Sequence, residues 1–422
     1  VSRNRNNYGA PGGDRLYRND NNKFIDVSEA AGIYSGDIDF GLGISVGDVN
    51  GDRYPDMYVS NDFWERDYLY INNRDGTFKE KLTDNFCYIS ANSMGSDIAD
   101  INNDGANDIF STDMLPSSNY RMKSALMIEE YFLEDIKWRN SYFFQYIQNA
   151  LQINNGDGTF KETGFYSGVA ATDWSWGSLI FDMDNDGLKD IFVSNGIYHD
   201  ITDLDFVDFI GSKEEVRKLV EAKGRSDIRD FVEYLPHNKQ RNFAFINQGN
   251  LKFENLAPSI GMNDESYSND AAYGDLDNDG DYDLVVNNVN MDAFIYKNAS
   301  KSNFLKVSLK GQSQNPRGIG TQVKVFSNQQ LQVMESFAAR GFQSSVDSDL
   351  IFGLGANKTI DSLVVIWPDL KMQSIDGIKI QTNATIELKY EDADKPLLPS
   401  KKMALELFEA SEIKLFSTTP RH

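Results

Sequence analysis

The feature that most constrains the fold is an acidic segment of nine residues that occurs four times along the chain. Each copy carries oxygen-bearing side chains at positions 1, 3, 5 and 9, and the copies begin at Asp48, Asp100, Asp182 and Asp275. Strand-like residues flank these segments, for example at 109–110 and 284–286. A regular internal repeat predicts that one supersecondary unit is built several times in succession.

A second repeated segment keeps step with the first. It is an apolar triplet that ends in Asn and is followed by a turn and a Phe, which predicts a β-hairpin. The Asn and Phe pairs are Asn19 with Phe24, Asn72 with Phe78, Asn154 with Phe160, Asn247 with Phe253, and Asn298 with Phe304. The basic unit is about 52 residues long, with additional residues near 115–148 and 200–240. We expect these additions to be helical, with one helix from Ser212 through about Lys223 and a second starting near Ser226.

Each repeat contains four predicted strands. In the first complete copy these are residues 43–49, 56–60, 68–72 and 77–81, and the acidic segment joins the first strand to the second. Four-stranded units of this period are typical of β-propeller blades. Residues 16–33 supply only the last two strands of a blade, so we predict that the chain starts inside a blade. We therefore expect an all-β protein whose residues 1–300 form a partial β-propeller of about four and a half blades.

The residue types of the acidic segments indicate calcium binding. Ca²⁺ takes six to eight oxygen ligands, and side-chain oxygens at positions 1, 3 and 5, a backbone carbonyl at position 7 and a carboxylate at position 9 would supply them. An EF-hand loop is excluded because its position 12 needs Glu, and Val59, Ser111, Val193 and Val286 stand there. The alternative is a solvated acidic turn, which four equivalent copies disfavour. We predict about four Ca²⁺ ions, held by Asp48, Asn50, Asp52, Tyr54 and Asp56; Asp100, Asn102, Asp104, Ala106 and Asp108; Asp182, Asp184, Asp186, Leu188 and Asp190; and Asp275, Asp277, Asp279, Asp281 and Asp283.

Composition excludes several classes of function. The formal net charge of -23 argues against a nucleic-acid partner, whose phosphates require clustered Lys and Arg. No apolar run is long enough to span a membrane. Cys87 is the single cysteine, so an internal disulfide is excluded, and we expect this thiol to be buried. The sequence begins with Val1 and a polar Arg/Asn stretch, so no signal peptide is visible, and we expect either that one was removed or that the chain is a fragment.

After Asn298 a different pattern begins. Strand-like runs at 304–310, 322–326, 331–336, 363–367 and 385–390 predict a small β-sandwich over residues 301–392. We expect residues 393–422 to be a linker and the start of a further repeat, because residues 407–412 are similar to residues 23–29.

These motifs resemble a known combination of families. The acidic segments and hairpins are similar to FG-GAP/VCBS repeats, and the stretches 318–321, 340–344, 352–355 and 365–369 are similar to the ASPIC/UnbV domain. Together they resemble the cartilage-acidic-protein-like family, especially long surface proteins of Bacteroidetes. The resemblance implies an exported protein, extracellular or at the cell surface, whose chain continues beyond this fragment with more blades and possible lipid anchorage. An RNA-binding role attached to this family is disfavoured by the charge.

Signals for catalysis are weak. Gly43 to Gly47 matches the pattern of a nucleophile elbow, but an acidic loop follows Ser45 where a helix would be required. We therefore predict a calcium-binding module or scaffold that recognises a protein or glycan and is not an enzyme, with a carbohydrate-active enzyme as the alternative. Residues 131–146 and 173–176 are rich in aromatic residues. Exposed, they would form a binding surface; we favour burial in the core.

Overall fold

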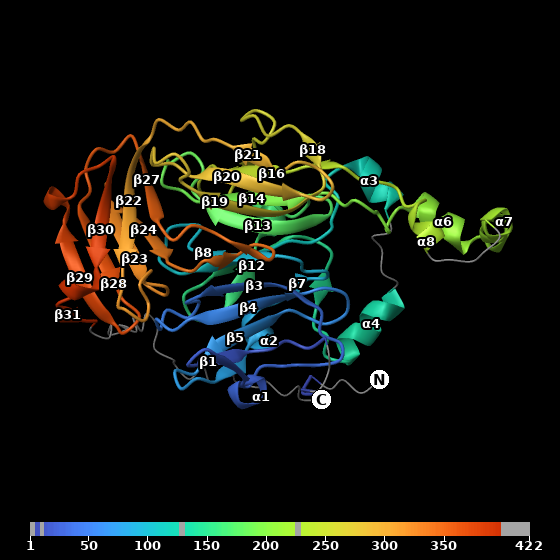
Figure 1. The fold of residues 1–422 in the computed structure, drawn as a ribbon, viewed down its shortest axis with the longest axis horizontal. Coiled ribbons are helices and arrows are strands. Elements are labelled where there is room, and N and C mark those ends of the chain that lie inside the picture. Colours follow the sequence, from blue (N-terminus) through green and yellow to red (C-terminus); the bar gives the residue numbers. More distant parts are fainter. Residues whose placement is uncertain (1–4, 9–11, 126–130, 224–228, 398–422) are drawn as a thin grey trace, which may run out of the picture.

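The computed structural model describes residues 5–8, 12–125, 131–223 and 229–397. The protein is all-β, and its first three hundred residues form sheets that stack face to face in chain order (Figure 1). Three of these sheets are four-stranded antiparallel meanders, as the repeat predicted. Their strands are β3 (Gly41–Gly47), β4 (Asp56–Asn61), β5 (Tyr68–Asn72) and β6 (Phe78–Glu80); β8 (Ser96–Ala99), β9 (Asp108–Ser111), β11 (Ala150–Asn154) and β12 (Phe160–Glu162); and β13 (Ser175–Phe181), β14 (Asp190–Asn195), β16 (Phe243–Asn247) and β17 (Phe253–Asn255).

The incomplete first blade is present as expected. Strands β1 (Tyr17–Asp20) and β2 (Lys23–Asp26) pair with each other and with no other described strand. The short helices α1 (Ser28–Ala31), α2 (Leu82–Asn85) and α5 (Gly164–Ser167) follow the fourth strands of successive blades. The innermost strands of consecutive blades contact one another, and among the described residues no comparable contact joins β19 of the last blade (Ser268–Gly274) to β3 of the first complete one, so the blades form an open arc.

The fifth predicted hairpin is wrong. The last blade has three strands, β19 (Ser268–Gly274), β20 (Asp283–Asn288) and β21 (Phe294–Tyr296), and Phe304 belongs instead to β22 (Asn303–Lys310) of the C-terminal sandwich. The physical reason lies in the turn. Gly76, Gly156 and Gly249 adopt positive φ in three of the hairpins, and Asn21 and Asn22 do so in the first, whereas no residue from 299 to 302 adopts positive φ.

The hydrophobic core lies between consecutive blades. Tyr58 and Leu69 of the first complete blade pack with Ile98 and Ile109 of the next, and equivalent clusters join the later blades. The innermost strands β3, β8, β13 and β19 contact one another in that order. Gly95 makes this approach possible, since a Cβ atom there would lie 2.5 Å from the carbonyl oxygen of Trp176. The acidic segments all follow these innermost strands and therefore lie on one side of the arc.

The two insertions are helical and project from the side of the arc opposite the C-terminal sandwich (Figure 1). The first contains α3 (Asn119–Ser124) and α4 (Tyr131–Arg139), and the second contains α6 (Leu204–Gly211), α7 (Lys213–Lys223) and α8 (Arg229–Val232). Helix α7 covers the predicted span as far as Lys223, the last described residue before 229, and Ser226 lies outside the described residues. Short paired strands connect the insertions to the arc: β7 (Ile89–Ser90) with β10 (Gln145–Tyr146), and β15 (Gln240–Arg241) with β18 (Glu265–Ser266).

The C-terminal region is a sandwich of two sheets. One sheet has the order β27-β22-β30 and the other β24-β23-β28-β29-β31. Trp367 and Leu363 are buried between them with Val307 and Val323. Besides β22, the strands are β23 (Gln322–Ser327), β24 (Gln330–Glu335), β27 (Leu350–Gly355), β28 (Ser362–Ile366), β29 (Lys371–Asp376), β30 (Ala384–Lys389) and β31 (Lys395–Pro396), with single 3-10 turns η1 (Gly377–Lys379) and η2 (Tyr390–Asp392). The expected further repeat at 407–412 lies outside the described residues.

A hairpin of the C-terminal region, β25 (Ala339–Arg340) and β26 (Ser344–Ser345), contacts the innermost strands of the arc. The backbone groups of Ser96 and Gly341 exchange two hydrogen bonds, of 2.9 and 3.3 Å. Arg340 donates from Nη1 to Oδ1 of Asp97 at 2.7 Å, and both side chains are buried. The arc and the sandwich are thus joined at the centre of the arc.

Candidate metal centres

The backbone of each acidic loop is held by its own carboxylates. In the third loop, Asp182 accepts hydrogen bonds from the backbone N–H groups of Asp186 and Gly187, at 3.2 and 2.9 Å. Asp184 accepts from the N–H of Asp186, and Asp186 accepts from the N–H of Leu188. The first and second loops repeat all of these contacts. The side chains at positions 1, 3 and 5 are therefore turned toward the inside of the same tight loop.

The aspartate at position 9 has a second role that the sequence pattern did not reveal. Oδ2 of Asp190 accepts the backbone N–H of Met183 at position 2, and its Oδ1 accepts the backbone N–H of Asn247, both at 2.8 Å. Equivalent pairs of contacts occur at Asp56, Asp108 and Asp283. This carboxylate closes the loop and also joins it to the third strand of its blade.

The repeated asparagine connects neighbouring blades. The side-chain amide of Asn247 donates to the carbonyl oxygen of Lys189 in its own blade, at 2.9 Å, and to that of Ile101 in the preceding loop, at 3.3 Å. Asn154 and Asn298 make the same two types of contact. The asparagine that predicted a hairpin therefore links each loop to the next.

Two loops bring three carboxylates together in a way that could hold a metal ion. Each residue in a set offers one oxygen, and these oxygens lie within 4.8 Å of one another; the sets are Asp182, Asp184 and Asp190, and Asp275, Asp277 and Asp283. A set of hard oxygen donors at this spacing fits Ca²⁺. In the first two loops, position 3 is Asn, and its amide donates to the carboxylate at position 5, at 3.2 Å for Asn50 and 2.9 Å for Asn102.

Basic side chains approach the loops to different extents. Arg53 and Arg74 form ion pairs with Asp48 and Asp52 in the first loop, at 3.5 and 3.0 Å. In the fourth loop, Lys306 pairs with Asp275 and Lys297 pairs with Asp277. Among the described residues, no ion pair reaches a carboxylate of the third loop. The buried ammonium of Lys189 donates to the carbonyl oxygen of Asp100 at 2.7 Å, and its charge opposes the rise in the pKa of Asp182 that burial causes.

Burial disfavours the ionised form of several of these carboxyl groups. It raises the pKa of Asp56 to about 7 and the pKa values of Asp108 and Asp182 to about 8. Mutual repulsion adds to this effect, since Asp184 and Asp186 raise the pKa of Asp182 further. A bound cation would remove both penalties.

Exposed aromatic side chains gather on the first insertion, contrary to the burial that we favoured. Tyr131 is 88% exposed and Trp138 is 57% exposed, and Trp138 stacks on Phe144 with ring centroids 6.1 Å apart. Tyr120, Phe132 and Tyr146 are also exposed. Tyr142 and Trp174 are buried, so only part of the two aromatic segments belongs to the core. Helix α4 ends at Arg139, which leaves residues 140–146 without helical structure.

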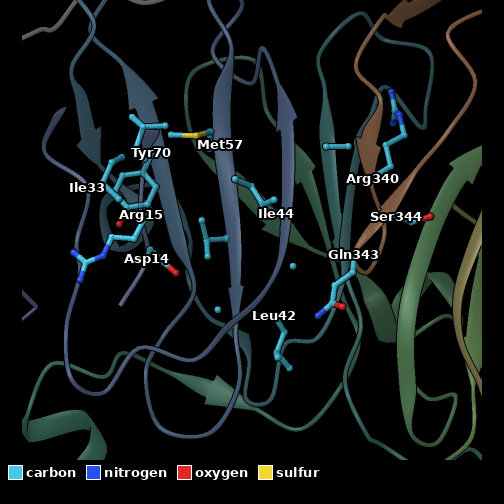
Figure 2. Close-up of a pocket in the computed structure, with 15 residues that line it drawn as sticks. Asp14, Arg15, Ile33, Leu42, Ile44, Met57, Tyr70, Arg340, Gln343 and Ser344 are labelled. Atoms are coloured by element: carbon cyan, nitrogen blue, oxygen red, sulfur yellow. The ribbon is translucent and has the colours of Figure 1, made fainter. Parts of the chain in front are cut away.

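A cavity of about 290 Å³ is lined by the first complete blade, the β25–β26 hairpin and residues of the incomplete first blade region, Asp14 to Leu16 and Ile33. Figure 2 shows Leu42, Ile44 and Met57 on one side of it and Gln343 and Ser344 on the other. Ile44 is 46% exposed, and burial raises the pKa of the Asp14 carboxyl, which also lines the cavity, to about 7. An apolar lining with a few polar groups is typical of ligand pockets.

The buried acids outside the loops are engaged in hydrogen bonds. Oδ2 of Asp113 accepts from the hydroxyl of Ser90 at 2.7 Å and from the backbone N–H groups of Ala91 and Gln148.

Ser45 is buried, and its hydroxyl donates to the carbonyl oxygen of Ser96 at 2.6 Å. This environment gives Ser45 a structural role and no helix follows it, as the sequence predicted. Cys87, in contrast, is exposed, so the prediction of a buried thiol is wrong.

Two family models match parts of this chain. Residues 48–111 match the FG-GAP-like repeat, and residues 311–395 match ASPIC and UnbV. The combination of FG-GAP-like repeats with an ASPIC/UnbV domain, predicted from the motifs, is thereby supported, and it fits a binding or scaffold module.

A search of curated proteins found no match. Among solved structures, the chain is similar to a lectin of Agrocybe aegerita, which is described as recognising non-reducing terminal N-acetylglucosamine. The two have 12% sequence identity and a TM-score of 0.26, and the match covers 81% of this chain and 93% of the lectin chain. Such a low TM-score supports no inference about a shared ligand.

Proposed function

We propose that this chain is a calcium-stabilised binding or scaffold module that recognises a protein or glycan partner. The observation that carries the proposal is the convergence of Asp182, Asp184 and Asp190, whose oxygens lie within 4.8 Å of one another in a loop that has no ion pair among the described residues. Bound Ca²⁺ would supply positive charge and bridge these oxygens. All four loops follow the same plan, so we propose about four ions.

In this proposal the loops are structural. Asp190 connects the loop to Asn247, and Asn247 connects it to the preceding loop at Ile101. Calcium at the loop would therefore stabilise the junction between two blades. Affinities in the range of about 10⁻⁴ to 10⁻³ M would suit a module in calcium-rich extracellular fluid.

We propose an extracellular or cell-surface location and a relationship to the cartilage-acidic-protein-like family. FG-GAP repeats are typical of extracellular proteins, and the match over residues 48–111 supports this location. Within the part of the chain that the structure describes, no helix has the length and apolar character needed to cross a bilayer. The net charge of -23 disfavours a nucleic-acid partner.

The first insertion is the proposed partner surface. Tyr131, Phe132 and Trp138 are exposed on a helix that projects from the arc (Figure 1). Exposed aromatic side chains provide stacking faces for sugars and anchors for protein partners. The apolar cavity beside Ile44 is the alternative location for a ligand.

The absence of catalysis is also a proposal. The buried carboxylates Asp67 and Asp113 each accept several hydrogen bonds, which supports a structural role. A carbohydrate-active enzyme would need a pair of carboxyl groups free to act as acid and base or nucleophile. Turnover of a polysaccharide panel by the purified chain would replace our proposal with that alternative.

The calcium proposal is tested by calorimetric melting of the whole chain with calcium and with a chelator. We expect calcium to raise the melting temperature, because it binds the folded loops and not the unfolded chain. Magnesium at the same concentration serves as the control, since its small octahedral shell fits these loops poorly. Equal melting temperatures in calcium and chelator would contradict the proposal.

The partner surface is tested by capture of glycan arrays and extracellular proteins on immobilised chain. We expect the double variant Tyr131→Ser/Trp138→Ser to lose capture while its melting temperature stays unchanged, because both side chains are exposed. Ile44→Asp is the matched variant for the cavity. If only Ile44→Asp abolishes capture, the insertion is not the partner surface.

A further inference from the structure

Strand β22 of the C-terminal sandwich places a buried lysine against the fourth loop. Nζ of Lys306 lies 2.9 Å from Oδ2 of Asp275, which is position 1 of that loop, and 3.5 Å from Oδ2 of Asp349. Lys306 is 7% exposed and Asp275 is 9% exposed. Both side chains are buried, so the contact between sandwich and arc holds this ion pair in place.

The contact with Lys306 changes the environment of Oδ2 of Asp275. In the first three loops, Oδ2 at position 1 accepts the backbone N–H of position 6, at 2.8 Å for Asp48, 3.0 Å for Asp100 and 2.9 Å for Asp182. In the fourth loop the same contact, from Gly280 to Asp275, is 3.3 Å long. Lys306 is therefore the nearest donor to this oxygen.

A second lysine near this loop differs in its surroundings. Lys297 contacts Asp277 and Asp279, but its side chain is 66% exposed. An exposed lysine can swing into solvent at little cost when another cation arrives, because surface ion pairs are weak. Lys306 has no such freedom.

We propose that the fixed ammonium group of Lys306 partly neutralises the carboxylates of the fourth loop and makes this loop a weaker calcium site than the third. The inference rests on the proposed function, in which the loops bind calcium. It identifies Lys306 as a residue that sets the relative affinity of two otherwise similar sites.

Comparison of the two loops gives the proposal its direction. Both bring three carboxylates to within 4.8 Å, and the fourth loop has an additional aspartate at position 7, Asp281. Carboxylate number alone would make the fourth loop the tighter site, since affinity rises with ligand charge.

Each loop has a buried lysine, but the two lysines differ in what they contact. Lys189 of the third loop donates to the carbonyl oxygen of Asp100 and, among the described residues, forms no ion pair with Asp182, whereas Lys306 lies 2.9 Å from Asp275. A fixed positive charge in direct contact with Asp275 opposes a divalent cation at the same carboxylates and reverses that order.

The test is isothermal titration of calcium into the full chain and its variants. We expect Lys306→Met to raise the affinity of one site about tenfold, because one fixed positive charge is removed at ion-pair distance. Lys306→Arg keeps the charge and should titrate like the original chain. Lys310→Met is the matched control, since Lys310 lies on the same strand with its side chain 65% exposed.

A second substitution assigns the gain to a loop. Adding Asp277→Asn to Lys306→Met should abolish the gain, because it removes a ligand of the fourth loop only. If Lys306→Met fails to fold, Lys306→Gln tests the same point, because it also removes the charge and retains a hydrogen-bond donor for Asp275.

The outcomes separate this inference from the function on which it rests. If the original chain binds no calcium, the proposed function fails. If it binds calcium and neither neutral variant binds more tightly, or if the gain persists with Asp277→Asn, Lys306 does not set the affinity of the fourth loop.

Discussion

The backbone N–H of Asn154 donates a 2.8 Å hydrogen bond to Oδ1 of Asp108, the last carboxylate of the second loop. The side-chain amide of Asn154 donates to the carbonyl oxygens of Asn107, at 2.9 Å, and of Val49 in the preceding loop, at 2.7 Å. Three bonds of one asparagine therefore join a strand, its own loop and the neighbouring blade. The two repeats seen in the sequence are parts of one structural joint.

Replacing Asn154 with Ala should destabilise the protein. The backbone bond to Asp108 remains, but the carbonyl groups of Val49 and Asn107 lose their buried partner. We expect a loss of about 2 kcal/mol in the free energy of unfolding, measured by urea denaturation, since a buried group left without its partner costs about 1–3 kcal/mol. Asn155→Ala is the matched control, because Asn155 is exposed and its side chain donates only to Thr159 among the described contacts. Equal losses for both variants would show that the side-chain contacts of Asn154 do not stabilise the connection between the blades.

Without metal, stability should decrease as pH rises. Burial raises the pKa values of Asp108 and Asp182 to about 8, well above the value of about 3.9 for an unfolded Asp. Between these values the folded chain binds more protons than the unfolded chain, so its stability is greatest at the acidic end and falls as pH rises. In chelator, the melting temperature should therefore decline from about pH 5 to about pH 8.

Calcium should reduce this decline, since it stabilises the ionised carboxylates. Asp182→Asn is the informative variant, because an amide has no proton to lose and the decline in chelator should become smaller. A melting temperature in chelator that rises over the same pH range would show that the ionised loops are stable without a cation.

Cys87 should react in the folded state. Its thiol is exposed, so a disulfide reagent such as DTNB is expected to modify one thiol per chain without denaturant. Cys87→Ser should abolish the reaction and leave the melting temperature unchanged. Reaction that requires denaturant would indicate that this thiol is covered in solution.

The sequence predicted those features that depend on local pattern. The strand boundaries around Asp56 and Tyr68, the acidic loops and most strands of the sandwich follow from alternation of apolar residues and from turn chemistry. The turn at 299–302 shows the limit of this approach, because Asn298 and Phe304 have the correct spacing but no residue between 299 and 302 adopts the positive φ found in the turns of the other hairpins. Phe304 consequently joins the sandwich.

Contacts between distant residues could not be predicted in this way. Glu335 accepts hydrogen bonds from the backbone N–H of Asp48 and the side-chain amide of Asn107, at 3.0 and 2.9 Å, and no local pattern relates these residues. The exposure of Trp138 could not be predicted from the sequence either, because the same apolar residue types occur in buried cores and on exposed helices. Both features depend on how complete elements pack together.

The ion pair between Arg340 and Asp97 should be the strongest single link between sandwich and arc. Arg340 donates from Nη1 to Oδ1 of Asp97 and to the carbonyl oxygen of Ile98, at 2.7 and 2.9 Å, and Asp97 is completely buried. Burial raises the pKa of Asp97, and the Arg340 guanidinium acts in the opposite direction. Removing one partner therefore leaves a buried charge without its counterion.

We expect Arg340→Met to lower the free energy of unfolding by about 3–5 kcal/mol, the cost of breaking a buried pair. The double variant Arg340→Met/Asp97→Asn should recover part of this loss, because neither charge then remains buried. Urea denaturation of the four chains gives the coupling energy, and Arg317→Met, at an exposed position, is the control. Additive effects of the two substitutions would show that the pair contributes nothing beyond the separate side chains.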